Sequence, residues 1–149
     1  MSHISFEGQG NIKFDVQQCL KELVVREVRG KVKALVPAKS YLFILKLKSV
    51  WDRTYRLEND LSKDVEWEKG KLAKDCGDIL SLLDHVEPLD RFVLRDFFEQ
   101  YPFLRSAFSF VANSDFSPGK FLPYRPKNTV ELIRSIKKIG SSHIIGDEY

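Results

Sequence analysis

The first residues of this sequence that could bind a ligand are two cations on either side of a small hydroxyl residue. Within the segment Lys46–Arg53, the side chains of Lys46, Ser49 and Arg53 are three and four residues apart, so they share one face if the segment is helical. Ser49 leaves room for a ligand, and a lysine point charge beside the planar fork of an arginine suits phosphate. The simpler alternative is an amphipathic helix whose basic face contacts only water.

Two carboxylates in a second segment, Lys74–Leu82, are spaced to meet those cations. Asp75 and Asp78 lie one turn apart on a helix, so both can point the same way, and Asp78 borders an apolar stripe. Across two packed helices they can pair with Lys46 or Arg53, or orient these cations toward a ligand. The alternative here is a plain salt bridge between helices, without a ligand.

Both segments lie in predicted helices. Apolar residues follow a helical period from Ser40, a suitable N-cap, to about Asp60, and a second helix is expected over residues 64–85. Gly77 lies inside the second helix, where glycine costs about 1 kcal/mol, and close packing of another helix would explain its presence. If the two segments form one site, we expect antiparallel helices with Arg53 within ion-pair reach of an aspartate.

The residues before these helices predict a small mixed sheet of three or four strands. Turn residues between β-prone segments, and apolar residues at helical spacing, define its elements. Strands are expected at residues 4–6, 12–16, 24–28 and 32–36, with a short helix over 15–23. The last two strands predict a hairpin around Gly30 that ends at Pro37, and Asp15 is expected on the second strand.

Further helices are predicted after the motif segments. Pro88 and Pro102 each suit the first turn of a helix, and Asn128 with Glu131 resembles a capping box. Helices are expected over residues 89–100, 102–112 and 128–139, with a loop over 113–127 and a disordered tail after Gly140.

Together these elements predict one α+β domain over residues 1–149. A chain of 149 residues buries roughly two-thirds of its unfolded surface, and 43% apolar with 30% charged residues is normal for a globular protein. We expect a small N-terminal mixed sheet followed by a bundle of about five helices. Its parts are a β-rich start at 1–37, a motif-bearing helical pair at 38–86, a helical layer at 87–139 and a tail at 140–149.

Composition narrows the function classes. The net charge of +3 is too small to imply nucleic-acid binding, although the basic stretch 120–138 is either a solvated face or a nucleic-acid contact. We expect Cys19 and Cys76 to be buried apolar residues, and the scattered histidines do not predict a metal site. Without a long apolar run or a signal peptide, the chain is expected to be cytoplasmic, with no membrane contact. A single methionine among many Lys and Glu residues is typical of thermophilic proteins.

The two motifs together resemble the back half of nucleotidyltransferase-like proteins, which include the toxins of type IV toxin–antitoxin (abortive-infection) systems. Residues 46–53 follow the pattern Lys-hydrophobic-x-small-hydrophobic-x-x-Arg, and residues 74–82 follow basic-Asp-x-x-Asp-hydrophobic-hydrophobic-x-Leu. Asp15 within Lys-Phe-Asp-Val, a hairpin, and Pro37 before the first motif helix add to the likeness. The resemblance covers residues 4–85.

The resemblance implies a site for Mg²⁺ and a nucleoside triphosphate. In this family a Gly-Ser or Gly-Gly turn and an Asp-x-Asp strand hold both, and a third acid completes the site. Asp15 would be that catalytic and metal-binding acid. The nucleotide would be bound by the cations and acids of the two motifs, with Ser49 between them: Lys46, Ser49, Arg53, Lys74, Asp75 and Asp78.

The sequence departs from the family at its front. Before Asp15 the only acid is Glu7, and no Gly-Ser turn or Asp-x-Asp pattern is present. Ser49 replaces the usual alanine, Lys74 stands where arginine is common, and about 20 residues separate the motifs, more than the family pattern implies. We expect a nucleotidyltransferase-like protein that binds nucleotide phosphate or partners a catalytic half. The alternative is a non-enzymatic interaction module, such as a toxin–antitoxin-like partner, with the Phe-rich helices 89–112 as its interface.

Overall fold

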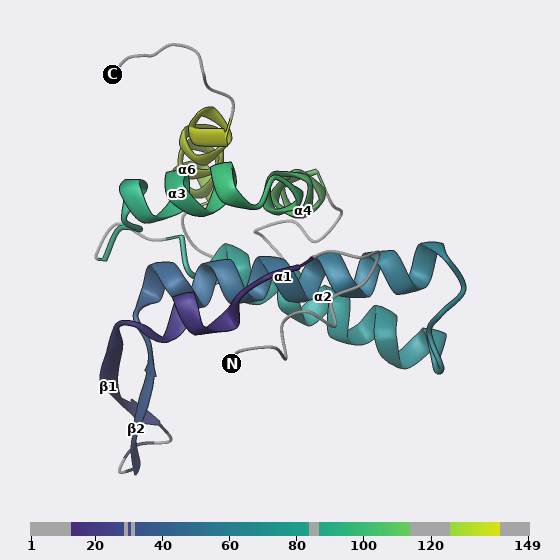
Figure 1. Cartoon of the computed structure of the whole chain (residues 1–149), viewed down its shortest axis with the longest axis horizontal. Helices are drawn as coiled ribbons and strands as arrows, with labels where there is room; N and C mark the ends of the chain where they lie inside the picture. The colour runs from purple at the N-terminus through teal and green to yellow at the C-terminus, as the bar shows by residue number, and fades with distance from the viewer. Residues whose placement is uncertain (1–12, 29, 31, 84–86, 114–125, 141–149) are drawn as a thin grey trace.

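In the part of the chain that the structure describes, a short 3-10 helix, a β-hairpin and five α-helices follow one another (Figure 1). The structure is a computed structural model that describes residues 13–28, 30, 32–83, 87–113 and 126–140. Its elements are η3 (Val16–Leu20), β1 (Leu23–Val28), β2 (Val32–Pro37), α1 (Lys39–Glu58), α2 (Val65–Ser81), α3 (Arg91–Gln100), α4 (Phe103–Ala112) and α6 (Pro126–Gly140). The predicted α+β layout is confirmed.

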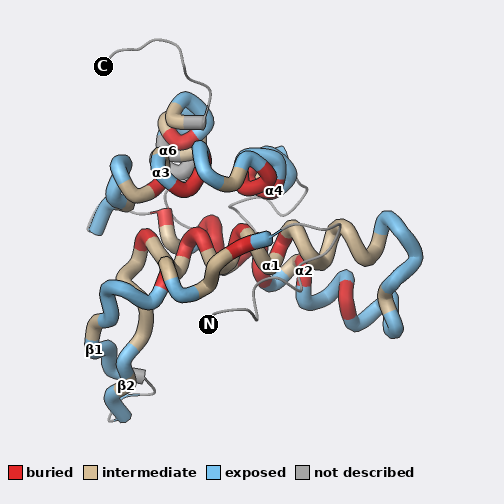
Figure 2. The backbone as a smooth tube through the Cα atoms, viewed as in Figure 1, coloured by how far each residue is buried: buried red, intermediate tan, exposed pale blue. Residues whose placement is uncertain are grey.

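The helices form two layers with the core between them. α1 and α2 lie side by side, and α3, α4 and α6 make a second layer over α1 (Figure 1). Figure 2 shows that the buried backbone is concentrated where these layers face each other. Phe43 of α1 and Phe108 of α4 pack there, with their ring centroids 5.8 Å apart. Most of the aromatic side chains of α3 and α4 are therefore core, although Phe92 and Phe110 are exposed.

The β-hairpin projects away from both helical layers (Figure 1). Its strands are antiparallel, with Val25 opposite Leu35, and they are the only strands among the described residues. At the base, the N–H of Ala38 donates to the carbonyl of Glu22 at 2.8 Å. Gly30 has a φ of 81°, a left-handed conformation that glycine adopts without strain. The predicted hairpin is confirmed.

Asp15 is not in a strand. Its carboxylate accepts a hydrogen bond from the N–H of Gln17 at 3.0 Å and caps η3. In the described residues this short 3-10 helix replaces both the strand expected at 12–16 and the longer helix expected at 15–23. Phe14, just before it, is fully buried and lies 4.7 Å from Tyr101 between ring centroids. The local cap and the burial of Phe14 outweigh the strand propensity of this segment.

Two predicted helix starts were wrong. Ser40 does not cap α1, because the helix begins at Lys39, and the buried Ser40 hydroxyl accepts the N–H of Asp90 at 2.7 Å. Asp90 itself caps α3, so the helix starts at Arg91 and Pro88 lies outside it. The N-cap residues are Ala38 for α1 and Asp90 for α3, and the sequence pattern indicated neither of them.

The other boundaries differ by a few residues. Asp64 caps α2, whose last residue is Ser81, earlier than predicted. The last helix begins at Pro126, so Asn128 lies inside it and not at its N-terminus as expected. The strand expected at 4–6, most of the loop at 113–127 and the tail after Gly140 lie outside the described residues. None of the described helices combines the length and the apolar character that a membrane span requires.

Candidate functional site

Polar and charged side chains line the contact between α1 and α2, and we call them the charged seam. Both motif segments face this contact because residues three and four apart share a helix face. The seam consists of Lys46, Ser49, Arg53, Arg56, Ser62, Glu68, Lys74, Asp75 and Asp78. Its ion pairs run in opposite orders along the two helices, from Arg56 with Glu68 to Lys46 with Asp78, so the helices are antiparallel as predicted.

Asp75 is the centre of the charged seam. Its side chain is 10% exposed, and its Oδ2 accepts the Ser49 hydroxyl at 2.7 Å and Arg53 Nε at 2.9 Å. Lys46 Nζ lies 3.8 Å from the other carboxylate oxygen. The expected ion pair between Arg53 and an aspartate is therefore present, and the short Ser49 side chain provides a donor between the two cations.

Glu68 closes the seam at the end near the α1–α2 turn. Arg56 donates to it twice, at 3.0 and 2.8 Å, and Arg53 NH1 and the Ser62 hydroxyl donate at 2.9 and 3.0 Å. The hydrogen bonds from Arg56, with those from Ser62 and Arg53, outweigh the effect of burial and lower the pKa of Glu68 to about 2. Sequence reasoning missed Glu68, although it lies seven residues before Asp75 and therefore on the same helix face.

Asp78 lies at the opposite, more open end. Lys46 Nζ and Lys74 Nζ reach its Oδ2 at 2.9 and 3.0 Å. Burial opposes its charge, but the hydrogen bonds from Lys46 and Lys74 prevail and hold the pKa of Asp78 below its usual value. The hydrogen bond to Asp78 likewise raises the pKa of Lys74, whose side chain is 64% exposed. Two cations thus share one carboxylate at the water-facing end of the charged seam.

Asp15 is not part of this arrangement. Its carboxylate caps η3, and its N–H donates to the hydroxyl of Tyr101 at 3.2 Å. Within the described ranges, no three His, Cys, Asp or Glu side chains are arranged to hold a metal ion. The structure therefore brings together six of the seven residues that the family resemblance implies, and it does not bring Asp15 to Asp75 and Asp78.

The cysteines are buried, as expected from the sequence. Cys19 lies in η3 and Cys76 in α2, and both are free thiols with no exposed surface. Burial, together with the nearby carboxylates of Asp15 and Asp75, raises the pKa of each thiol to about 12. Because the thiolate is the reactive form, both cysteines are poor nucleophiles at neutral pH.

The carboxylates of the charged seam are paired with cations of the same seam. Each of its three carboxylates accepts hydrogen bonds from at least one cation and is held in place by them. No protein-family model matches the chain, and neither a curated protein nor a solved structure matches it. The resemblance to nucleotidyltransferases thus stays a prediction from the motif residues.

The outer face of the hairpin carries a second candidate site. Leu23, Val25 and Leu35 share this face and are 46%, 62% and 65% exposed. Nearer the tip, Glu27 lies opposite Lys33 on the same face. On the other face, Arg26 forms an ion pair with Glu87 at 3.0 Å. One face of the projecting hairpin is therefore tethered by this ion pair to the loop before α3, and the opposite apolar face is left open.

Proposed function

We propose that this chain is a non-enzymatic interaction module that associates with a second copy of itself through the outer face of its hairpin. The observation that carries the proposal is the apolar exposure of Leu23, Val25 and Leu35 in one patch. Removing large apolar side chains of this kind from water is favourable in free energy. An exposed cluster of them is typical of interaction sites. A two-stranded hairpin is also marginally stable alone, so a covered face would stabilise it.

Charge complementarity supports a second copy as the partner. Glu27 and Lys33 are directly opposite in the hairpin register, and among the described residues neither forms an ion pair. If two outer faces pack around a two-fold axis parallel to the strands, β1 of one copy lies over β2 of the other. Glu27 then faces Lys33 of the second copy, and Val25 faces its Leu35. Isologous two-fold contacts of this kind are the commonest in homo-oligomers.

The expected dimer is weak. Three partly exposed apolar side chains on each copy would bury on the order of 500 Å² in total, about 13 kcal/mol at ~25 cal/mol/Å². Lost translational and rotational freedom and side-chain ordering offset about 4–15 kcal/mol of this gain. Because stable interfaces usually bury more than about 1,000 Å², we expect a dissociation constant between micromolar and millimolar.

Sedimentation equilibrium of the full chain, from micromolar to millimolar concentration, tests this proposal. Glu27→Lys and Lys33→Glu each place like charges across the interface, so each variant should be monomeric alone. An equal mixture of the two should form a heterodimer. Lys63→Glu, an exposed site outside the hairpin, is the matched control and should dimerise as the wild type does. A wild type that stays monomeric at millimolar concentration, or single variants that still dimerise, would refute the proposal.

The charged seam agrees with a non-enzymatic role. Asp75 and Glu68 direct their oxygens at Ser49, Arg53 and Arg56, so these groups stabilise the helix pair. Removing one partner of such a buried pair is costly because a carboxylate is then left uncompensated. We infer that these residues are kept in place by folding, rather than available for a substrate.

A second candidate function is the binding of nucleotide phosphate at the open end of the charged seam. It is supported by the charged seam as a whole, in which four cations face three carboxylates, and by the position of Lys46 and Lys74 at its open end. Calorimetry with ATP or GTP and Mg²⁺ is the test. Millimolar or tighter binding that is lost in a Lys46→Ala/Lys74→Ala double variant would support this function. Weaker binding would leave the interaction module as the better proposal.

A further inference from the structure

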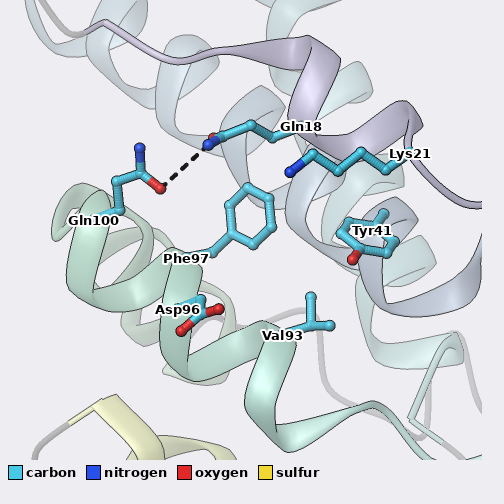
Figure 3. A pocket seen from close by; sticks show the side chains of 7 residues that line it. All are labelled: Gln18, Lys21, Tyr41, Val93, Asp96, Phe97 and Gln100. Carbon is cyan, nitrogen blue, oxygen red and sulfur yellow. Dashed lines mark hydrogen bonds between the residues drawn. The ribbon is translucent and has the colours of Figure 1, made fainter.

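A small cavity lies between η3 and α3, with Tyr41 of α1 on one side (Figure 3). Its volume is ≈ 120 Å³. Pockets for drug-sized ligands are usually above about 300 Å³, so this cavity suits a molecule of only a few heavy atoms. Phe97, which is buried, forms an apolar wall, and its ring meets that of Tyr41 edge-on at 6.0 Å.

One positively and one negatively charged side chain line this cavity, and they do not form an ion pair with each other. Lys21 follows η3 and Asp96 is on α3, and Figure 3 shows their charged groups approaching from different sides of the Phe97 ring. Within the part of the chain that the structure describes, neither side chain makes a hydrogen bond or an ion pair. The cavity thus offers one cation and one anion that are exposed to water and that no described protein group pairs.

A chain of hydrogen bonds fixes the amide groups on another wall. The Tyr101 hydroxyl donates to Gln18 Oε1 at 2.8 Å, and Gln18 Nε2 donates to Gln100 Oε1 at 3.4 Å (Figure 3). The Asp15 N–H donates in turn to the Tyr101 hydroxyl. This orientation leaves the amide N–H groups of Gln100 available to a ligand, because its oxygen already accepts.

Tyr41 adds a phenol to the lining. Burial, together with the nearby acids Glu22, Asp90 and Asp96, raises its pKa above the usual value. Its hydroxyl therefore stays protonated at neutral pH and can donate a hydrogen bond. Convergent polar groups around an apolar wall are the usual composition of a small-molecule site.

We infer that this cavity binds a small zwitterion, of the class of free amino acids, with its carboxylate at Lys21 and its ammonium group at Asp96. A simple anion or a simple cation would leave one of these two charges unmatched. A zwitterion matches both, and its carboxylate also accepts from the Gln100 amide. The Phe97 ring would contact the aliphatic carbon of the ligand, and the small volume selects short side chains.

Titration of the full ¹⁵N-labelled chain with glycine, alanine and serine, followed by NMR, tests this inference. We expect saturable shifts at the amides of Lys21 and Phe97, with a dissociation constant in the millimolar range. Acetate and methylammonium, which each carry one of the two charges, should bind at least about tenfold more weakly. Absence of saturable shifts up to about 50 mM amino acid, or equal binding of acetate, would overturn the inference.

Two variants and two control variants distinguish binding at this cavity from a general effect of removing a charge. Asp96→Asn and Lys21→Met should each weaken amino-acid binding at least about tenfold. Glu99→Gln on the same helix and Lys13→Met are exposed and do not line the cavity, so they should bind as the wild type does. Circular dichroism checks that all four variants fold. Unchanged affinity in Asp96→Asn and Lys21→Met would also overturn the inference.

Discussion

Replacing Glu68 with glutamine removes one charge from the charged seam and leaves the shape of the side chain almost unchanged. Glu68 is 5% exposed and accepts hydrogen bonds from Arg53, Arg56 and Ser62. Its pKa falls from 4.5 to about 2 on folding, and each tenfold change in proton affinity is worth ~1.4 kcal/mol. Allowing for solvent screening at this end of the seam, we expect Glu68→Gln to lower the free energy of unfolding at pH 7 by ~2–3 kcal/mol.

The pH dependence gives the sharper test. Because folding lowers the pKa of Glu68, its stabilisation is complete above about pH 4.5 and is lost as the pH falls toward about 2. Urea unfolding of the wild type and Glu68→Gln should therefore show a gap at pH 7 that closes near pH 2. Glu66→Gln is the matched control, since its side chain is 88% exposed in the same helix, and it should stay within ~0.5 kcal/mol of the wild type. A gap under ~1 kcal/mol at pH 7, or the same gap at both pH values, would refute the reasoning.

Three further experiments test other parts of the structure. Arg53→Ala should cost ~3 kcal/mol in urea unfolding, because it leaves two buried carboxylates short of a partner, whereas Lys74→Ala should cost less than ~1 kcal/mol. Asp64→Ala should cost ~1 kcal/mol by removing the N-cap of α2, and similar stability in thermal melts would contradict the capping role. Cys19 and Cys76 should resist a thiol reagent at pH 8 in the folded chain and react once urea unfolds it, so rapid labelling of the folded chain would contradict their burial.

The helix pair was predictable because its signals are local. Lys46, Ser49 and Arg53 are spaced at three and four residues, and Asp75 and Asp78 are three apart, which fixed the faces that meet. The pairing of Arg53 with an aspartate followed from that spacing, and the structure shows that this aspartate is Asp75. Glu68 lies outside both motifs and was missed, although its spacing of seven residues from Asp75 places it on the same helix face.

The parts that failed depend on contacts between distant residues. The hydroxyl of Ser40 could serve as a cap, but it bonds to Asp90, fifty residues later. Phe14 has the propensity of a strand residue, yet it is buried among aromatic rings of α3 and α4. The open face of the hairpin was also unpredictable, since apolar residues occupy both faces of β1 and no polar face marks the side exposed to water.

The burial of Phe14 has a consequence for synthesis. The rings that cover it belong to residues such as Tyr101, and the contact between Asp15 and Tyr101 spans 86 positions of the chain. At ~5–20 residues per second, the ribosome makes that stretch in roughly 4–17 s. For this interval Phe14 of the nascent chain lacks the rings that cover it, while the α1–α2 pair can already form. The segment around Phe14 is therefore made before the helices that cover it and docks only after they have been made.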